Sequence, residues 1–425
     1  MDAYKNLLTL RRGKTPGQLV IQMTDKCNAR CPQCGMRVTE PFRRTRLSSD
    51  DIKRIIDSAA EKGVKVLSFT GGEPLLLFDD LIQLIHYAGR AGVEFIRTGT
   101  NGFVFANSDR PGFRSKVRRM AEALASTPLR NFWISIDSSV PSVHETMRGF
   151  PGIIAGIEKA IPIFHEAGLY PSANLGINRN ISGNGDEKSA LFAHPSTAGR
   201  GKDYLEAFHG EMREGFRRFY RFVIGLGFTI VNTCYPMSVD EESDGDALQS
   251  VYAATSTDRI VRFSPEEKSL LFRALMETIP EFRSQIRIFS PRASLYALHK
   301  HYAGQPTIMH PCRGGIDYFF IDSRDGNAYP CGYRGNESFG KFWDMPPDGP
   351  LPATDCFQCD WECFRDPSEL FGPLLRAIND PLGLFRMVRL DKRYFRIWLE
   401  DLRYYKDCDF FDGRRPPRPD RLRRF

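Results

Sequence analysis

The stretch Thr24-Asp25-Lys26-Cys27-Asn28-Ala29-Arg30-Cys31-Pro32-Gln33-Cys34 spaces three cysteines as C-x3-C-x2-C, and Gly71-Gly72-Glu73-Pro74 follows it along the chain. Three thiolates can hold three irons of a [4Fe-4S] cluster and leave the fourth iron open to a small chelating ligand. A zinc site is the alternative, but zinc sites usually take four ligands, and the nearest further Cys or His is His86. We therefore favour a cluster site with one open iron.

This pairing of motifs resembles the radical S-adenosylmethionine (radical SAM) superfamily. The resemblance implies that Cys27, Cys31 and Cys34 bind a [4Fe-4S] cluster whose open iron binds SAM. It also implies that a 5'-deoxyadenosyl radical, formed from SAM, takes a hydrogen atom from the substrate, and that a reductant such as flavodoxin or ferredoxin is a partner. The family usually has an aromatic residue just before the third cysteine, where this chain has Gln33.

Short β-rich runs alternate with longer helical patterns up to about residue 235, which is typical of parallel βαβ units. We expect an α/β fold with a partial (β/α)6 TIM-like barrel, as the resemblance also implies. The expected strands are 17–23, 65–70, 93–100, 131–137, 170–177 and 228–233, with a helix at 49–62. The cysteine loop and the other polar motifs follow these strands, where the chemistry of parallel barrels gathers.

Candidate cofactor-binding residues stand at the ends of the second to fourth strands. Glu73 is expected to accept from the SAM ammonium, with Gly71 and Gly72 allowing close backbone approach and Pro74 stiffening the turn; a plain strand-to-helix turn is the alternative. Ser135 and Asp137 point to one face and are candidates for the ribose or methionine groups of SAM, although Asp137 is also suited to cap a helix. Asn101 and Asn174 are weaker candidates, and Arg148 is expected either to contact SAM or to form a structural salt bridge.

A second set of cysteines lies near the C-terminus: Cys312, Cys331, Cys356, Cys359 and Cys363. Asp325-Gly326-Asn327 predicts a β-hairpin between the first two. The set resembles the SPASM and twitch extensions of radical SAM enzymes, which bind auxiliary clusters. Five thiols support one auxiliary [4Fe-4S] cluster with Cys312, Cys331, Cys356 and Cys359 as ligands and Cys363 as the alternate fourth; zinc on the same thiols is the alternative. Cys234 is either a buried apolar cysteine or a residue of the active-site cavity.

Four regions are expected: a core barrel at 1–240, a connecting helical segment at 241–304, an auxiliary cluster module of small α+β type at 305–366, and a helical extension with a basic tail at 367–425. The glycine-rich segment 178–202 is expected to be a substrate lid or a disordered insertion. The last twelve residues hold six arginines and one aspartate, so the tail is either a contact for an anionic partner or a solvated extended segment. The chain shows no membrane span and no signal peptide, which indicates a cytoplasmic protein with reduced, metal-binding cysteines.

The function that this pattern favours is a radical SAM oxidoreductase that oxidises or cross-links a small metabolite with help from the auxiliary cluster. Only sixteen residues precede the first expected strand, too few for a cobalamin-binding or leader-binding domain. Maturation of a peptide is the alternative. A non-catalytic zinc-binding or RNA-binding protein is the third hypothesis, and it would be colourless and leave SAM intact.

Overall fold

The computed structural model describes residues 10–36, 43–181, 183, 201–236, 248–251, 256, 258–346 and 356–425. Nine strands form one sheet in the order β7-β6-β5-β4-β3-β2-β1-β8-β9. All neighbouring strands are parallel except β8 and β9. The sheet is open, because β7 and β9 are its edges, so the expected partial barrel is confirmed.

The six expected strands are all present, in sequence order across the sheet. They are β1 (Gly17–Thr24), β2 (Val64–Gly71), β3 (Phe95–Thr100), β4 (Leu129–Ser135), β5 (Ser172–Gly176) and β6 (Ile230–Cys234). Their buried residues are mostly apolar, as in sheets covered on both faces. The fourth strand ends at Ser135, two residues before the expected end, so Asp137 lies in the loop that follows.

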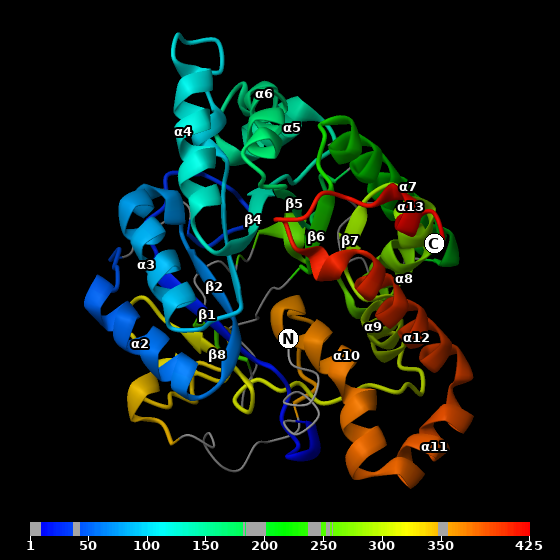
Figure 1. Ribbon diagram of the computed structural model, residues 1–425. Helices are drawn as coiled ribbons and strands as arrows, with labels where there is room; N and C mark the ends of the chain where they lie inside the picture. The colour runs from blue at the N-terminus through cyan, green and yellow to red at the C-terminus, as the bar shows by residue number, and fades with distance from the viewer. Residues whose placement is uncertain are drawn as a thin grey trace.

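Helices connect the strands and pack on the outer side of the sheet (Figure 1). They are α2 (Ser49–Glu61), α3 (Phe78–Arg90), α4 (Phe113–Ser126), α5 (Pro141–Arg148), α6 (Ile153–Glu166) and α7 (Lys202–Gly225). The expected helix at 49–62 is α2, which Ser48 caps by accepting from the Asp51 N–H and which buries Ile52, Ile55 and Ile56. The expected lid falls largely on 182 and 184–200, which lie outside the described residues.

The segment after β6 extends the sheet, although the sequence predicted only helical and mixed structure there. Helix α8 (Pro265–Phe282) begins with a capping box at Ser264 and packs against α7. Strand β7 (Arg287–Phe289) pairs with β6, and α9 (Arg292–Tyr302) follows and packs on α8. This segment is therefore continuous with the core in the structure.

The C-terminal module joins the opposite edge of the sheet. Strand β8 (Tyr318–Ile321) pairs with β1 in parallel and turns back into β9 (Ala328–Tyr329), which confirms the expected hairpin. Helices α10 (Glu362–Asn379), α11 (Pro381–Leu390) and α12 (Lys392–Asp407) follow (Figure 1). Helices α10 and α12 pack against α9, and α11 connects them. The module thus closes the edge of the strand that leads into the first cysteine loop.

The basic tail is packed, so the expectation of a solvated extended segment is wrong. Gly413 donates to the Arg130 carbonyl and accepts from the Tyr170 N–H, each at 2.7 Å. Short helix α13 (Pro419–Leu422) buries Leu422, and Phe425 lies edge-on to Tyr404. Asp409 pairs with Arg415 and Arg418, and Asp412 pairs with Arg415, so two of the tail arginines have partners within the chain.

No helix in the described part of the chain combines the length and the apolar character needed to cross a membrane.

Candidate functional site

The loop that carries Cys27, Cys31 and Cys34 follows β1 and is held by the loop that follows β2. Gly72 N–H donates to the Thr24 carbonyl at 2.7 Å, and Glu73 N–H donates to the Lys26 carbonyl at 2.9 Å. A Cβ atom added to Gly72 would overlap the Lys26 carbonyl, so only glycine permits this approach. The two sequence motifs are therefore in direct backbone contact.

Glu73 is fully buried and joins the ends of β2 and β3. Its carboxylate accepts from Leu75 N–H at 2.9 Å and from Asn101 N–H at 2.6 Å. Burial raises the pKa of Glu73 to about 7, against the lowering effect of these backbone donors. Asn101 in turn donates from Nδ2 to Cys27 Sγ, 3.6 Å away, and to Asn28 Oδ1 at 2.9 Å. Glu73 and Asn101 thus connect the end of β3 to the cysteine loop by hydrogen bonds.

Asp137 and Arg148 form a bidentate ion pair beside the same loop, with distances of 2.7 Å to Nε and 2.9 Å to Nη2. Of the alternatives open for Arg148, the salt bridge is therefore present. Burial raises the pKa of all three nearby thiols, and the Arg148 guanidinium partly opposes that rise. The Asp137 N–H donates to His144 Nδ1 at 3.1 Å, and burial lowers the pKa of His144 to about 4.

Backbone N–H groups point at the thiol sulfurs in a repeated pattern. Ala29 N–H donates to Cys27 Sγ at 3.5 Å, and Met36 N–H donates to Cys34 Sγ at 3.4 Å. Burial raises the pKa of Cys31 to about 12 and of Cys34 to about 11, so both are neutral thiols until a metal displaces their protons. Donors to sulfur and a nearby cation fit an anionic iron–sulfur group, because such contacts stabilise cluster sulfurs.

The inner face of the sheet carries a polar row next to this loop. The register pairs Ser135 with Asn174 and Asn174 with Asn232, so the three side chains share one face. Asn232 Nδ2 donates to Asn174 Oδ1 at 2.6 Å. Asn174 and Asn232 stay partly exposed although their strand neighbours Ala173 and Val231 are fully buried. A polar, partly exposed row of side chains therefore crosses β4, β5 and β6.

The second site brings together four of the five C-terminal cysteines. Cys312, Cys331, Cys356 and Cys359 are all buried and line one pocket with Trp361, Phe364 and other residues. Cys312 N–H donates to the Cys356 carbonyl at 2.8 Å across an isolated antiparallel bridge. The same backbone pattern recurs, with the N–H groups of Gly314, Tyr333 and Trp361 donating to the sulfurs two residues earlier. These four thiols have the shared surroundings of a ligand set.

The fifth cysteine, Cys363, does not line the pocket that the other four share. Its sulfur lies 3.6 Å from Glu362 Oε1, and Glu362 also contacts Cys234, the last residue of β6. Cys234 Sγ lies 3.5 Å from Asn174 Oδ1. Cys363 and Cys234 therefore lie at the junction of α10 with the polar inner face. This placement makes Cys363 a poorer candidate for the fourth ligand than Cys359.

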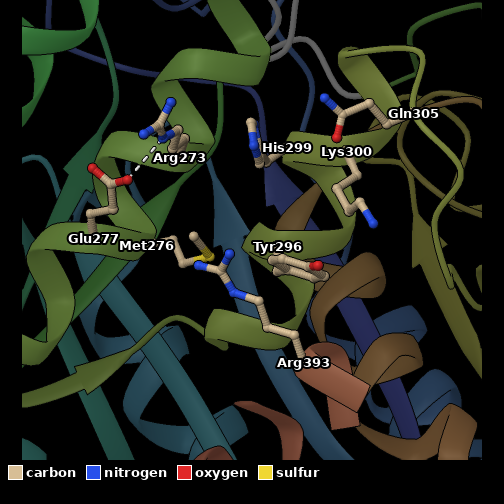
Figure 2. Close-up of a pocket in the computed structure, with 8 residues that line it drawn as sticks. All are labelled: Arg273, Met276, Glu277, Tyr296, His299, Lys300, Gln305 and Arg393. Carbon is tan, nitrogen blue, oxygen red and sulfur yellow. Dashed lines mark hydrogen bonds and ion pairs between the residues drawn. The ribbon is translucent and has the colours of Figure 1, made fainter. Parts of the chain in front are cut away.

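A separate pocket opens among the outer helices α8, α9 and α12 (Figure 2). Its lining residues are Arg273, Met276, Glu277, Tyr296, His299, Lys300, Gln305 and Arg393. None of the residues that the sequence singled out lines it.

Across the described ranges of the chain, no three or more His, Cys, Asp or Glu side chains lie close enough together to hold a single metal ion.

Sequence reasoning missed the residues whose position depends on register or on long-range contacts. Asn232 has no motif around it and joins the site only because β6 pairs with β5. Glu362 and Arg365 flank Cys363 in the sequence but take their hydrogen-bond partners from distant segments. The N–H groups that donate to the sulfur of the cysteine two residues earlier leave only a weak signal in the sequence. None of the residues that supply them is a proline, so each has an N–H to donate. These residues are Ala29, Met36, Gly314, Tyr333 and Trp361.

The chain is similar in sequence to a known family and to several known proteins. Residues 21–178 match the family model described as the radical SAM superfamily. The chain is 28% identical over 365 residues to an AdoMet-dependent heme synthase of Methanosarcina barkeri, covering 84% of this chain and 87% of that protein. It is 28% identical to an AdoMet-dependent heme synthase of Oleidesulfovibrio alaskensis and 25% identical to a probable GTP 3',8-cyclase of Thermococcus kodakarensis, each over 40% of this chain. It spans only 41% and 51% of the length of these last two relatives.

Among solved structures, the chain is similar to "Native anSMEcpe with bound AdoMet", with a TM-score of 0.48 and 15% identity, over 77% of this chain and 78% of that one. It is also similar to the Streptococcus suis protein SuiB bound to S-adenosylmethionine, with a TM-score of 0.45 and 16% identity, over 78% of this chain and 64% of that one.

Proposed function

Because residues 21–178 of this chain are a radical SAM domain, we propose that the protein cleaves S-adenosylmethionine reductively and oxidises a small-molecule substrate by hydrogen abstraction. Members of the superfamily use a [4Fe-4S] cluster and SAM. Cys27, Cys31 and Cys34 would hold this cluster. When bound, it supplies the electron that converts SAM into a 5'-deoxyadenosyl radical.

The observation that carries this proposal is the contact between the two motifs. Glu73 N–H donates to the Lys26 carbonyl, and Asn101 reaches from the third strand to Cys27. Three strand ends thus meet around a loop with three thiols. Such a meeting of loops over fixed strands is the usual basis of catalytic sites in parallel barrels.

In this proposal the polar residues around the loop bind and orient SAM. Glu73 provides the negative charge for the methionyl ammonium and, through Asn101, fixes the cysteine loop. Ser135 shares its face with Asn174 and Asn232 and offers a hydroxyl to the nucleoside. Asp137 and Arg148 are committed to each other, so their part is to shape the loop and place a positive charge near the thiols.

The four C-terminal thiols would hold one auxiliary [4Fe-4S] cluster. The two sites are attached to neighbouring strands, because β8 pairs with β1, which leads into Cys27. Strand β9 runs back antiparallel to β8, so Cys331 lies toward the start of these strands. An electron left on the substrate after hydrogen abstraction would then have an acceptor, which makes a two-electron oxidation the natural outcome.

The names of the relatives favour a small molecule over a peptide as substrate. The protein matched over most of both chains is a heme synthase, and a relative matched over the core is a GTP cyclase. We therefore place peptide maturation second. Residues of the polar inner face, above all Asn174, Asn232 and Cys234, are the candidates for substrate contact.

Iron analysis of anaerobically reconstituted protein tests this proposal. Two cubes predict about eight irons and eight sulfides per chain, whereas zinc at the second site predicts about four irons and one zinc. Cys331→Ala should lower the iron toward about four while SAM cleavage stays measurable. A wild-type protein with no iron, or with zinc alone, would refute the proposal.

A further inference from the structure

Arg365, on the first turns of α10, binds the segments that carry the C-terminal thiols. Its side chain is 1% exposed. The guanidinium donates to three backbone carbonyls: His310 at 2.7 Å, Cys356 at 3.1 Å and Cys359 at 3.3 Å. His310 stands two residues before Cys312, so one side chain holds the segments of three of the four thiols.

The charge of Arg365 has no carboxylate partner within ion-pair distance among the described residues. Two acids on its helix have other hydrogen-bond partners. Glu369 accepts from the His310 N–H and the Tyr394 hydroxyl, each at 2.9 Å, and Asp366 accepts from the Ser294 hydroxyl at 2.6 Å. Three other buried arginines have such a partner: Arg148 pairs with Asp137, Arg179 with Glu267, and Arg283 with Asp401. Arg287, which is as buried as Arg365, donates instead to the carbonyls of Thr229 and Asp412. An arginine buried without a counter-charge is costly, because carbonyl dipoles offset only part of the lost hydration.

The groups whose negative charge would act on Arg365 are Glu369 and, once they bind a metal as thiolates, the cysteines of the C-terminal site. Burial disfavours the positive charge of Arg365, whereas negative charges on Cys312, Cys359, Glu369 and Cys356 favour it. Four cysteines that bind a metal do so as thiolates, and a tetrathiolate iron–sulfur cluster carries net negative charge that grows when it accepts an electron.

We propose that Arg365 is a built-in counter-charge of an anionic iron–sulfur cluster on Cys312, Cys331, Cys356 and Cys359, and that it raises the reduction potential of that cluster in addition to any effect of Arg334, which lines the same pocket. The inference rests on the auxiliary cluster proposed above. Arg365 acts through backbone carbonyls and through its field, so it is a positioning residue. A fixed positive charge favours the more negative, reduced state, so it raises the potential and makes this cluster the better electron acceptor.

A redox titration on a Cys27→Ala, Cys31→Ala, Cys34→Ala background tests the inference, because only the C-terminal cluster then gives a signal. Arg365→Gln should shift the midpoint potential to more negative values, and Arg365→Lys, which keeps the charge but loses the planar fork, should shift it less. Arg287→Gln is the matched control, since Arg287 is also 1% exposed and donates to the carbonyls of Thr229 and Asp412 but lies outside the thiol pocket. It should leave the potential unchanged.

The outcomes separate this inference from the function on which it rests. If the background protein holds no cluster at all, the proposed auxiliary site fails. If it holds about four irons and Arg365→Gln keeps both the iron and the wild-type potential, the role of Arg365 is refuted while the auxiliary site stands. If Arg365→Gln assembles no cluster, recovery of iron by Arg365→Lys supports a charge role, and failure of the lysine variant, with a native circular dichroism spectrum, overturns it.

Discussion

At the scale of single residues, the charges beside the N-terminal thiols are paired inside the protein. The Asp137 side chain is 1% exposed, and its partner Arg148 is 10% exposed. Removing one member of such a pair leaves the other buried and uncompensated, which costs more than the pair itself contributes.

Asp137→Asn should therefore lower the free energy of unfolding by about 3–5 kcal/mol. Urea unfolding of the iron-free protein measures this loss. The matched control is Glu166→Gln, since the pair of Glu166 with Arg118 is about half exposed and should cost less than about 1 kcal/mol. Equal effects of the two substitutions would contradict the structural role of the buried pair.

His144 gives the site a defined pH dependence. Burial lowers its pKa from 6.5 to about 4, so the unfolded chain binds a proton at this residue that the folded chain does not. Stability from this residue is present above about pH 6.5 and is lost as the pH falls toward 4, by up to about 3 kcal/mol. His144→Gln should remove this part of the acid sensitivity, measured as the difference in unfolding free energy between the two proteins across that range. Parallel pH curves would show that His144 does not titrate as the structure implies.

Glu73→Gln should weaken SAM binding by roughly 10- to 150-fold, because a charge-assisted hydrogen bond contributes about 1.5–3 kcal/mol. Equilibrium dialysis of the reconstituted protein measures the dissociation constant, and the iron content checks that the cluster is retained. An unchanged dissociation constant with full iron would leave Glu73 with only its observed contacts to Leu75 and Asn101.

The candidate residues were predictable where a local motif carries the chemistry. The cysteine spacing and Gly71-Gly72-Glu73-Pro74 can be recognised directly in the sequence. The partner of Arg148 was not predictable. The sequence alone does not distinguish an Asp137 that binds SAM from one that pairs with an arginine, because that depends on the tertiary structure. Arg365 could not be found either, since its three partners come from segments brought together only by tertiary packing.

At the scale of elements, the site depends on how closely the loops after β1 and β2 approach each other. Gly72→Ala should push the Lys26 carbonyl away and displace the cysteine loop, because the added Cβ meets backbone that cannot rotate aside. We expect the iron content to fall from about eight toward about four. Gly210→Ala in α7, where nothing lies within 4 Å, is the control and should keep its iron. Full iron in Gly72→Ala would mean that the loop tolerates the shift.

Strand prediction succeeded for β1 to β6 because apolar runs and turn residues alternate clearly with helical patterns. It failed for β7, which has three residues, and for the attachment of β8 to β1. So short a strand leaves no periodicity to read. The partner of a strand is decided by which edge remains open after the rest of the sheet forms, and that information is not local.

At the scale of the whole molecule, the C-terminal module protects an edge of the core sheet. All four residues of β8 are buried, and Thr15 beside β1 donates to Asp317 and Tyr318. A chain ending at Gly304 would leave β1 with an unpaired hydrophobic edge. We expect it to aggregate, as seen by size-exclusion chromatography; a stable monomer would show that the two regions fold independently.

The central claim is that Cys27, Cys31 and Cys34 make this protein a radical SAM enzyme, and the formation of 5'-deoxyadenosine tests it most directly. Wild-type protein, reconstituted without oxygen and supplied with dithionite and SAM, should release 5'-deoxyadenosine. The variant with all three cysteines replaced by alanine should release none, while it keeps the iron of the C-terminal site. Cleavage of SAM by the triple variant at the wild-type rate would contradict the account.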